Sequence, residues 1–228
     1  MQTAQDSPRR WERRKDARPG EIIAAALDVF VEKGYAAARL DDVAHRAGVS
    51  KGTLYLYFQS KEALFQAVVR ETIVPLLSEG SDVIARHGGS RAQLLRELFA
   101  EWWARFGSTK LAGITKLVMA EAGNFPELGS FFQREVVAPS LALYRCVIDS
   151  GIASGEFRPV DVDYAVRVLQ APLVMLSIWN QSIGRFCDTA DLDLARFTRA
   201  HAELAIAALQ APAPAPVLTL ARADQDAS

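Results

Sequence analysis

Cysteine, methionine and histidine are scarce in this chain of 228 residues, which contains two, three and three of them. Cys146 and Cys187 lie far apart and lack metal-ligand spacing, so we expect two buried free thiols in a reducing compartment rather than a disulfide framework. His45, His87 and His201 are isolated, with no second histidine one helical turn away. The sequence therefore predicts no metal site and no catalytic set, and we expect a protein that is not an enzyme and needs no cofactor.

Long apolar runs and strand patterns are missing as well. No stretch approaches the roughly 18 uninterrupted apolar residues of a membrane span, and the first residues lack the apolar segment of a signal peptide. We therefore expect a cytoplasmic protein without a membrane partner. No alternating β-branched runs are joined by Asn-Gly or Asp-Gly, whereas apolar residues recur at spacings of three and four nearly throughout. This periodicity predicts an all-α fold.

Charge is balanced overall but uneven along the chain. The formal net charge is −1, with +3 over residues 1–61 and −4 over residues 62–228. Much of the positive excess lies in an arginine-rich stretch, residues 9–18. A basic end on an acidic body favours a polyanionic partner at that end, and a solvated tail explains the same residues equally well. We predict a basic flexible arm over residues 1–18.

Glycine, proline and serine predict where the first four helices begin and end. Pro19 is a favoured first-turn residue and Gly34 ends the helix that Pro19 begins. Gly48 supplies a tight turn, and Ser50 and Ser60 are placed to cap the helices that follow them. These signals predict helices over residues 19–34, 41–47, 51–57 and 60–77.

The remaining chain predicts a second, larger helical region. Its helices are expected over residues 91–106, 111–122, 127–154, 162–183 and 192–210. Pro75 is expected to bound the stiff part of the fourth helix, which joins the two regions. The expected organisation is a flexible arm over 1–18, a helix-turn-helix domain over 19–65 with its motif at about 39–58, a helical domain over 66–210, and a disordered Ala-Pro and polar tail over 211–228.

Two short helices joined by Gly48-Val49-Ser50 form a predicted helix-turn-helix, whose second helix enters the DNA major groove. In that helix Leu54 is needed for packing, and most other side chains present hydrogen-bond donors. Glycine costs a helix interior about 1 kcal/mol relative to alanine, and one use for Gly52 is to let the DNA backbone approach closely. Residues suited to phosphates or base edges are Lys51, Thr53, Tyr55, Tyr57 and Lys61.

The same residues lie in one ungapped block that runs from Gly34-Tyr35 through Gly48-Val49-Ser50-Lys51-Gly52-Thr53-Leu54-Tyr55 and Tyr57-Phe58 to Ser60-Lys61-Glu62. This block resembles the TetR/AcrR family of bacterial transcriptional regulators. The resemblance implies a homodimer that binds double-stranded DNA at a palindromic operator and represses until a small-molecule inducer binds the larger domain. Carried over by position, the DNA contacts are Lys51, Gly52, Thr53, Tyr55, Tyr57 and Lys61.

The chain departs from the family pattern before its second helix. The family usually has a pair of hydroxyl residues there, and this chain has Ala38-Arg39. The hydroxyl that caps the helix and touches a phosphate is therefore missing, and Arg39 is the expected replacement as a phosphate contact.

The larger domain carries many aromatic and methionine residues, which are core, dimer interface or the lining of an inducer cavity. The layout of the family makes six of them, together with Cys146, candidates for the cavity, and the ligand itself stays open. These residues are Trp102, Phe106, Met119, Phe132, Tyr144, Cys146 and Met175. The last two predicted helices are apolar on more than one face, which favours pairing with a second copy. Candidates for that interface are Leu169, Leu173, Leu176, Phe197 and Leu204.

These observations predict a sequence-specific DNA-binding transcriptional regulator that is released from its operator by a small molecule. The alternative is a helical protein-interaction module, or one that coats DNA non-specifically, without a small-molecule ligand. A coating protein binds any duplex with a steep salt dependence, so a preference between DNA sequences distinguishes the two hypotheses.

Overall fold

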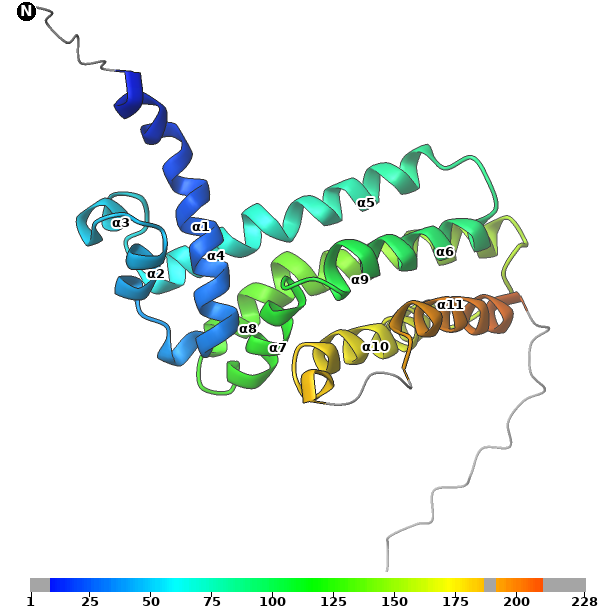
Figure 1. Cartoon of the computed structure of the whole chain (residues 1–228). Coiled ribbons are helices and arrows are strands. Elements are labelled where there is room, and N and C mark those ends of the chain that lie inside the picture. Colours follow the sequence, from blue (N-terminus) through cyan, green and yellow to red (C-terminus); the bar gives the residue numbers. More distant parts are fainter. Residues whose placement is uncertain (1–8, 187–191, 211–228) are drawn as a thin grey trace, which may run out of the picture.

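The computed structural model describes residues 9–186 and 192–210, and every regular element within them is helical. This confirms the all-α prediction. The predicted tail over 211–228 and Cys187 lie outside the described residues. Figure 1 shows a small N-terminal head, formed by α1 to α3 and the start of α4, joined to a larger body of helices.

The head begins with a longer helix than the sequence predicts. Helix α1 spans Arg9–Ala37 and passes through Pro19, so the backbone of residues 9–18 is helical where we expected a flexible arm. Proline removes one backbone N–H bond but fixes a helical φ, and here the helix continues on both sides of it. At Gly34 the φ angle is 77°, which is outside the helical region, and α1 kinks there. The predicted end at Gly34 therefore corresponds to the kink.

Helices α2 (Leu40–Arg46) and α3 (Lys51–Tyr57) follow, as predicted. The predicted single helix over 60–77 is instead two helices, α4 (Lys61–Thr72) and α5 (Val74–Arg86), which meet at Ile73. Pro75 lies in the first turn of α5, where its missing N–H has no intrahelical partner to lose, so it opens a helix instead of ending one.

Between residues 91 and 210, the described part of the chain adds seven further helical elements to the body, and two π-helical turns that continue neighbouring helices. The α-helices are α6 (Arg91–Trp102), α7 (Ala112–Glu121), α8 (Pro126–Phe132), α9 (Ala138–Ala153), α10 (Val162–Asn180) and α11 (Leu194–Gln210), with a 3₁₀ turn η3 (Ile183–Phe186). The π-turns are η1 (Trp103–Gly107), which extends α6, and η2 (Gln133–Val137), which connects α8 to α9.

Two hydrophobic clusters hold these helices together. The first joins the head to α7 and α8, and includes Phe30 and Phe65, both fully buried, as well as Phe106 of η1. The second packs α6, α9, α10 and α11 against one another around residues such as Phe99 and Val166. Because the first cluster crosses the boundary between head and body, the two parts share buried surface.

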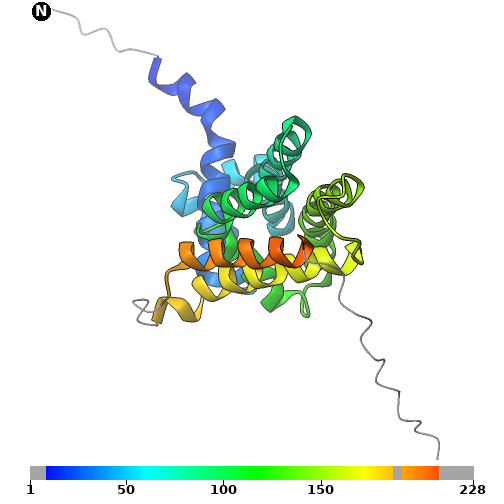
Figure 2. The ribbon, with the colours of Figure 1, turned by 90° about the vertical axis from the view of Figure 1, so that its right-hand side faces the viewer.

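Two stretches in the body, Pro126–Ala153 and Val162–Asn180, are long and apolar enough to cross a membrane by length and composition, although no run of uninterrupted apolar residues marks them. Only 28% of each apolar window is buried. Core helices of globular proteins pass the same test. In this chain both stretches contribute to the clusters of the body, and α10 and α11 lie side by side on the side away from α3 (Figures 1 and 2).

Candidate DNA-binding surface and ligand cavity

The turn between α2 and α3 is built by local hydrogen bonds. Gly48 has a φ of 64°, a left-handed conformation that glycine adopts without strain. The Ser50 hydroxyl then accepts a hydrogen bond from the Thr53 amide at 3.0 Å and caps α3, as predicted. Leu54, which is fully buried, anchors α3 on the core of the head. The turn and this one anchor leave most of α3 facing outward.

The outward face of α3 carries the residues that the sequence singled out. Tyr55 and Tyr57 are 43% and 40% exposed. No protein atom lies closer than 3.8 Å to the position that a Cβ on Gly52 occupies, so nothing within the described protein requires glycine there. Leu56 is 83% exposed, and sequence reasoning missed it because it considered only hydrogen-bond donors. An exposed leucine on a recognition helix is suited to the methyl group of thymine.

The two predicted lysine contacts differ in their surroundings. Lys51 pairs with Asp41 of α2 at 2.9 Å, and both side chains are exposed, so a phosphate can replace the carboxylate at little cost. Lys61 is half-buried and donates to the Tyr35 and Ala36 carbonyl oxygens at 2.7 and 3.2 Å. Its ammonium also lies 4.6 Å from the centre of the Tyr35 ring. Lys61 therefore has a positioning role in the head that the sequence did not suggest.

Ion pairs fix α2 against α1. Arg46 makes two hydrogen bonds of 2.7 Å to the Glu32 carboxylate, and Lys33 lies 2.9 Å from Asp42. The hydrogen bond from Arg46 lowers the pKa of Glu32. Arg39 precedes α2 and its side chain makes no capping bond, as expected from the missing hydroxyl, so its exposed guanidinium is available to a phosphate.

A carboxylate of the body closes over the junction between α1 and α2. Glu121, at the end of α7, accepts hydrogen bonds from the Tyr35 and Ala36 amides at 2.6 and 2.7 Å. Together with Lys61, which binds the carbonyls of the same two residues, it forms a clasp around the kink at Gly34. A Cβ on Gly34 would lie 2.5 Å from Glu121 Oε1, so the clasp needs glycine for space as well as for φ.

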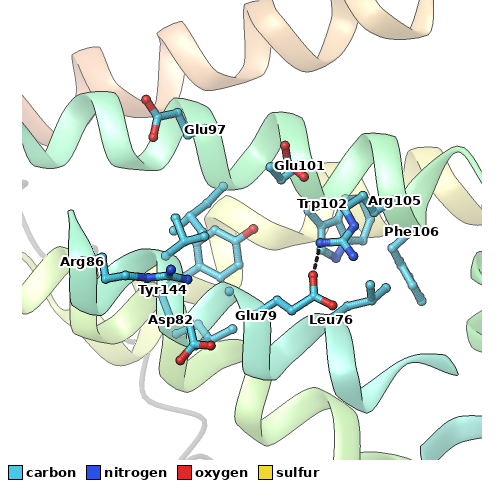
Figure 3. A pocket seen from close by; sticks show the side chains of 14 residues that line it. Leu76, Glu79, Asp82, Arg86, Glu97, Glu101, Trp102, Arg105, Phe106 and Tyr144 are labelled. Atoms are coloured by element: carbon cyan, nitrogen blue, oxygen red, sulfur yellow. Dashed lines mark hydrogen bonds and ion pairs between the residues drawn. The ribbon is translucent and has the colours of Figure 1, made fainter. Parts of the chain in front are cut away.

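A cavity of about 490 Å³ lies in the body between α5, the α6–η1 helix and α9 (Figure 3). Its apolar wall includes Leu76, Leu98, Trp102, Phe106, Leu143 and Tyr144. Its charged lining consists of Glu79, Asp82, Arg86, Glu97, Glu101 and Arg105. Arg105 donates to Glu79 across the cavity, from η1 to α5, and this hydrogen bond lowers the pKa of Glu79. A cavity of this size, largely apolar with a few polar groups, is typical of small-molecule sites.

The structure brings three of the seven predicted ligand residues to this cavity, namely Trp102, Phe106 and Tyr144. The other four do not line it. Phe132 is buried in the cluster shared with the head, Cys146 is exposed and not buried as expected, and Met119 and Met175 are each 65% exposed. Most of the lining residues that were not predicted lie on α5. The predicted helix over 60–77 covers only the first residues of α5.

The predicted interface residues also divide into two groups. Leu169, Leu173 and Leu176 are buried within one protomer, and the first two belong to the cluster that packs α10 on α6 and α9. Leu204 is 73% exposed and Phe197 is half-buried, both on α11. The exposed apolar residues of α10 are Tyr164, Val168 and Met175, at 69%, 68% and 65%. Among the described residues no three histidine, cysteine or acidic side chains are grouped to hold a metal ion.

An exposed helix-turn-helix that packs on a larger helical body with a cavity is typical of helix-turn-helix transcriptional regulators. Residues 22–68 match the family model described as bacterial regulatory proteins, tetR family, and residues 86–182 match that of the tetracyclin repressor-like C-terminal domain. The chain therefore belongs to the TetR family and is a DNA-binding transcriptional regulator.

Individual relatives agree with this assignment. The chain is 28% identical over 177 residues to the HTH-type transcriptional repressor KstR2 of Rhodococcus jostii, covering 75% of this chain and 83% of that protein. It is 47% identical to the HTH-type transcriptional activator FasR of Mycolicibacterium smegmatis, over 64 residues that span only 28% of this chain and 29% of FasR. A crystal structure of FadR from Bacillus subtilis in complex with stearoyl-CoA shares the fold, with a TM-score of 0.71 and 23% identity over 83% of this chain and 98% of that one.

Proposed function

We propose that the chain is a homodimeric repressor that binds a palindromic operator through α3 and leaves it when a small, largely apolar molecule fills the cavity. The observation that carries this proposal is the exposed surface of α3, which includes Tyr55, Tyr57 and a Gly52 that no neighbouring side chain crowds. Repression is supported by KstR2, named a repressor, which aligns with three quarters of the chain, whereas FasR, named an activator, aligns with little more than the head.

The proposed DNA contacts come from α3 and from the residue before α2. They are Arg39, Lys51, Gly52, Thr53, Tyr55 and Tyr57, with Leu56 added from its exposure. Lys61 is proposed to act through the clasp, and its third N–H group is the part that remains for a phosphate. The chain acts by binding DNA and a ligand, not by catalysis, and as a DNA-binding regulator of bacterial type it belongs in the cytoplasm.

A second copy of the chain is proposed to cover the outer faces of α10 and α11. Tyr164, Val168 and Met175 are spaced by four and seven residues, which places them on one face of α10, and Leu204 lies on the neighbouring α11. Two-fold pairing through this exposed apolar face would also place the two α3 helices in successive major grooves of the DNA. Such grooves are about 34 Å apart, or a multiple of that distance.

The test is a titration followed by fluorescence anisotropy. Purified protein is mixed with the DNA that flanks its own gene and with scrambled DNA of equal length, at two salt concentrations. A specific regulator prefers one flanking sequence by about 1,000-fold or more. Arg39→Ala should weaken this binding and lower its salt dependence, whereas Arg199→Ala, which removes an exposed arginine of α11, should change neither. Equal and steeply salt-dependent binding to both DNAs would instead support a non-specific coating protein.

A further inference from the structure

The charged lining of the cavity has more carboxylates than cations. Glu79 and Arg105 neutralise each other as an ion pair. Asp82, Glu97 and Glu101 remain, against one further cation, Arg86. The lining therefore carries a formal net charge of −2, which attracts positively charged molecules to the opening and repels anions.

Arg86 is already counted in this net charge, and its side chain is held by its own helix. Its Nε donates to the Asp82 carbonyl oxygen of its own helix at 3.0 Å, and the side chain is exposed. Glu97 accepts a hydrogen bond from the uncharged Gln93 side chain at 2.8 Å, and its one nearby ionisable partner among the described residues is His87, whose Nδ1 lies 3.7 Å away. Figure 3 shows Glu97 and Glu101 on α6 and Asp82 on the opposite helix, α5, so both helices contribute acidic residues to the lining.

The inner part of the cavity is aromatic and contains one polar group without a partner. Trp102 and Phe106 have ring centres 5.4 Å apart, and both line the cavity. Tyr144 is only 4% exposed and its ring stacks on Phe99, yet its hydroxyl has no hydrogen-bond partner among the described residues. In Figure 3 this hydroxyl is directed into the cavity. Burial raises the pKa of Tyr144, so the phenol stays neutral and offers one donor and one acceptor to a bound molecule.

We propose that the molecule recognised by this cavity is an apolar organic cation, whose aromatic or aliphatic body fills the space beside Trp102, Phe106 and Tyr144 and whose positive charge faces the acidic rim. Aromatic faces combined with carboxylates favour such cations through cation–π and Coulomb attraction together. An acyl-coenzyme A, in contrast, brings several phosphate charges to a rim that is already negative. This inference rests on the proposed function, because it names the ligand class for the same cavity.

The experiment compares two probes of almost the same shape and opposite charge, the tetraphenylphosphonium cation and the tetraphenylborate anion, by isothermal titration calorimetry with the full chain. Stearoyl-CoA is a third probe. We expect the cation to bind at least about tenfold more tightly than either anion. Trp102→Ala should weaken binding of the cation, because it removes part of the aromatic wall. Such a loss would show that the cation binds in the cavity.

Variants of the rim isolate the contribution of charge. Asp82→Asn, Glu97→Gln and Glu101→Gln together should weaken binding of the cation about tenfold and should strengthen binding of the borate. Asp149→Asn, which removes an exposed carboxylate of α9 outside the cavity lining, is the matched control and should change neither affinity.

Tighter binding of tetraphenylborate or stearoyl-CoA, lost in Trp102→Ala, would overturn the cationic class and leave the cavity as the ligand site. If none of the three probes binds, or if Trp102→Ala has no effect on binding, both the ligand class and the proposed role of the cavity fail. Operator binding, measured separately by anisotropy, reports on the DNA-binding part of the proposed function in either case.

Discussion

Replacing Glu121 with alanine tests whether the clasp holds the head on the body. The carboxylate accepts two backbone N–H bonds, at 2.6 Å from Tyr35 and 2.7 Å from Ala36. A hydrogen bond to a charged group contributes about 1.5–3 kcal/mol when it is shielded from water. The bond to Tyr35 is partly buried, whereas water can replace the bond to exposed Ala36. We therefore expect the free energy of unfolding to fall by about 2 kcal/mol, and not by the sum of two shielded bonds.

The measurement combines urea denaturation with amide hydrogen exchange. In Glu121→Ala the Tyr35 and Ala36 amides should exchange faster, because they lose their acceptor. Asp149→Ala, an exposed carboxylate of α9, is the control and should stay within about 0.5 kcal/mol of the wild type. If Glu121→Ala is as stable as this control and exchange at Tyr35 is unchanged, the clasp does not stabilise the junction.

A double-mutant cycle that combines Gly34→Ala with Glu121→Ala separates the two reasons why the kink requires glycine. Gly34 has a φ of 77° and a ψ of 171°, a region that is open essentially to glycine alone, so alanine there costs about 1–3 kcal/mol by itself. Its Cβ also collides with Glu121 Oε1, at 2.5 Å, and displaces the carboxylate. In the Glu121→Ala background the collision is gone and only the backbone cost remains, so Gly34→Ala should be less damaging there. Strictly additive effects on the free energy of unfolding would refute the collision.

Three further outcomes are expected. Gly52→Ala should raise the free energy of unfolding by up to about 1 kcal/mol, because nothing in the protein crowds the site. It should still weaken operator binding in an anisotropy titration. Unchanged affinity would contradict close approach of DNA at Gly52. Leu204→Glu with Val168→Glu should convert a dimer to monomers in light scattering, and a persistent dimer would place the interface elsewhere. Burial lowers the pKa of His201, so its contribution to stability should be full above about pH 6.5 and decline as the pH falls below that value. In thermal unfolding curves recorded at several pH values, His201→Gln should reduce this decline. An unchanged dependence of stability on pH would show that His201 does not cause it.

The helix-turn-helix could be predicted from sequence because its determinants are local. Ser50 and Ser60 cap the helices that follow them by bonds to amides three residues away. The left-handed turn at Gly48 also depends on one residue alone. Such features depend on short-range chemistry, so the order of residues is sufficient to place them.

The cavity and the clasp depend on contacts that the order of residues does not specify. The predicted helix over 60–77 takes Pro75 as the limit of its stiff part, although proline is equally compatible with a first turn, so the sequence does not indicate α5 or the half of the charged lining that α5 carries. When a helix is apolar on several sides, its sequence does not show which side faces the core. Met119 and Met175 were therefore expected to line the cavity, and both are exposed on the surface. The bond between Glu121 and Tyr35 joins residues 86 positions apart, and no periodicity indicates it.

Three side chains connect the cavity to the head, because Leu76, Trp102 and Phe106 line the cavity and also pack in or against the buried cluster of the head. Phe106 lines the cavity and is also part of the buried cluster that contains Phe30 and Phe65 of the head. It lies in the π-turn η1, and such turns differ from a regular helix by a small local shift that is often found at functional sites. Because packed cores transmit displacement instead of absorbing it, a molecule that moves Phe106 must also disturb the packing beneath α1 and α4. A ligand weakens operator binding only if it binds more tightly to a conformation of the protein that binds DNA less well, and displacement of Phe106 is one way for the cavity to favour such a conformation.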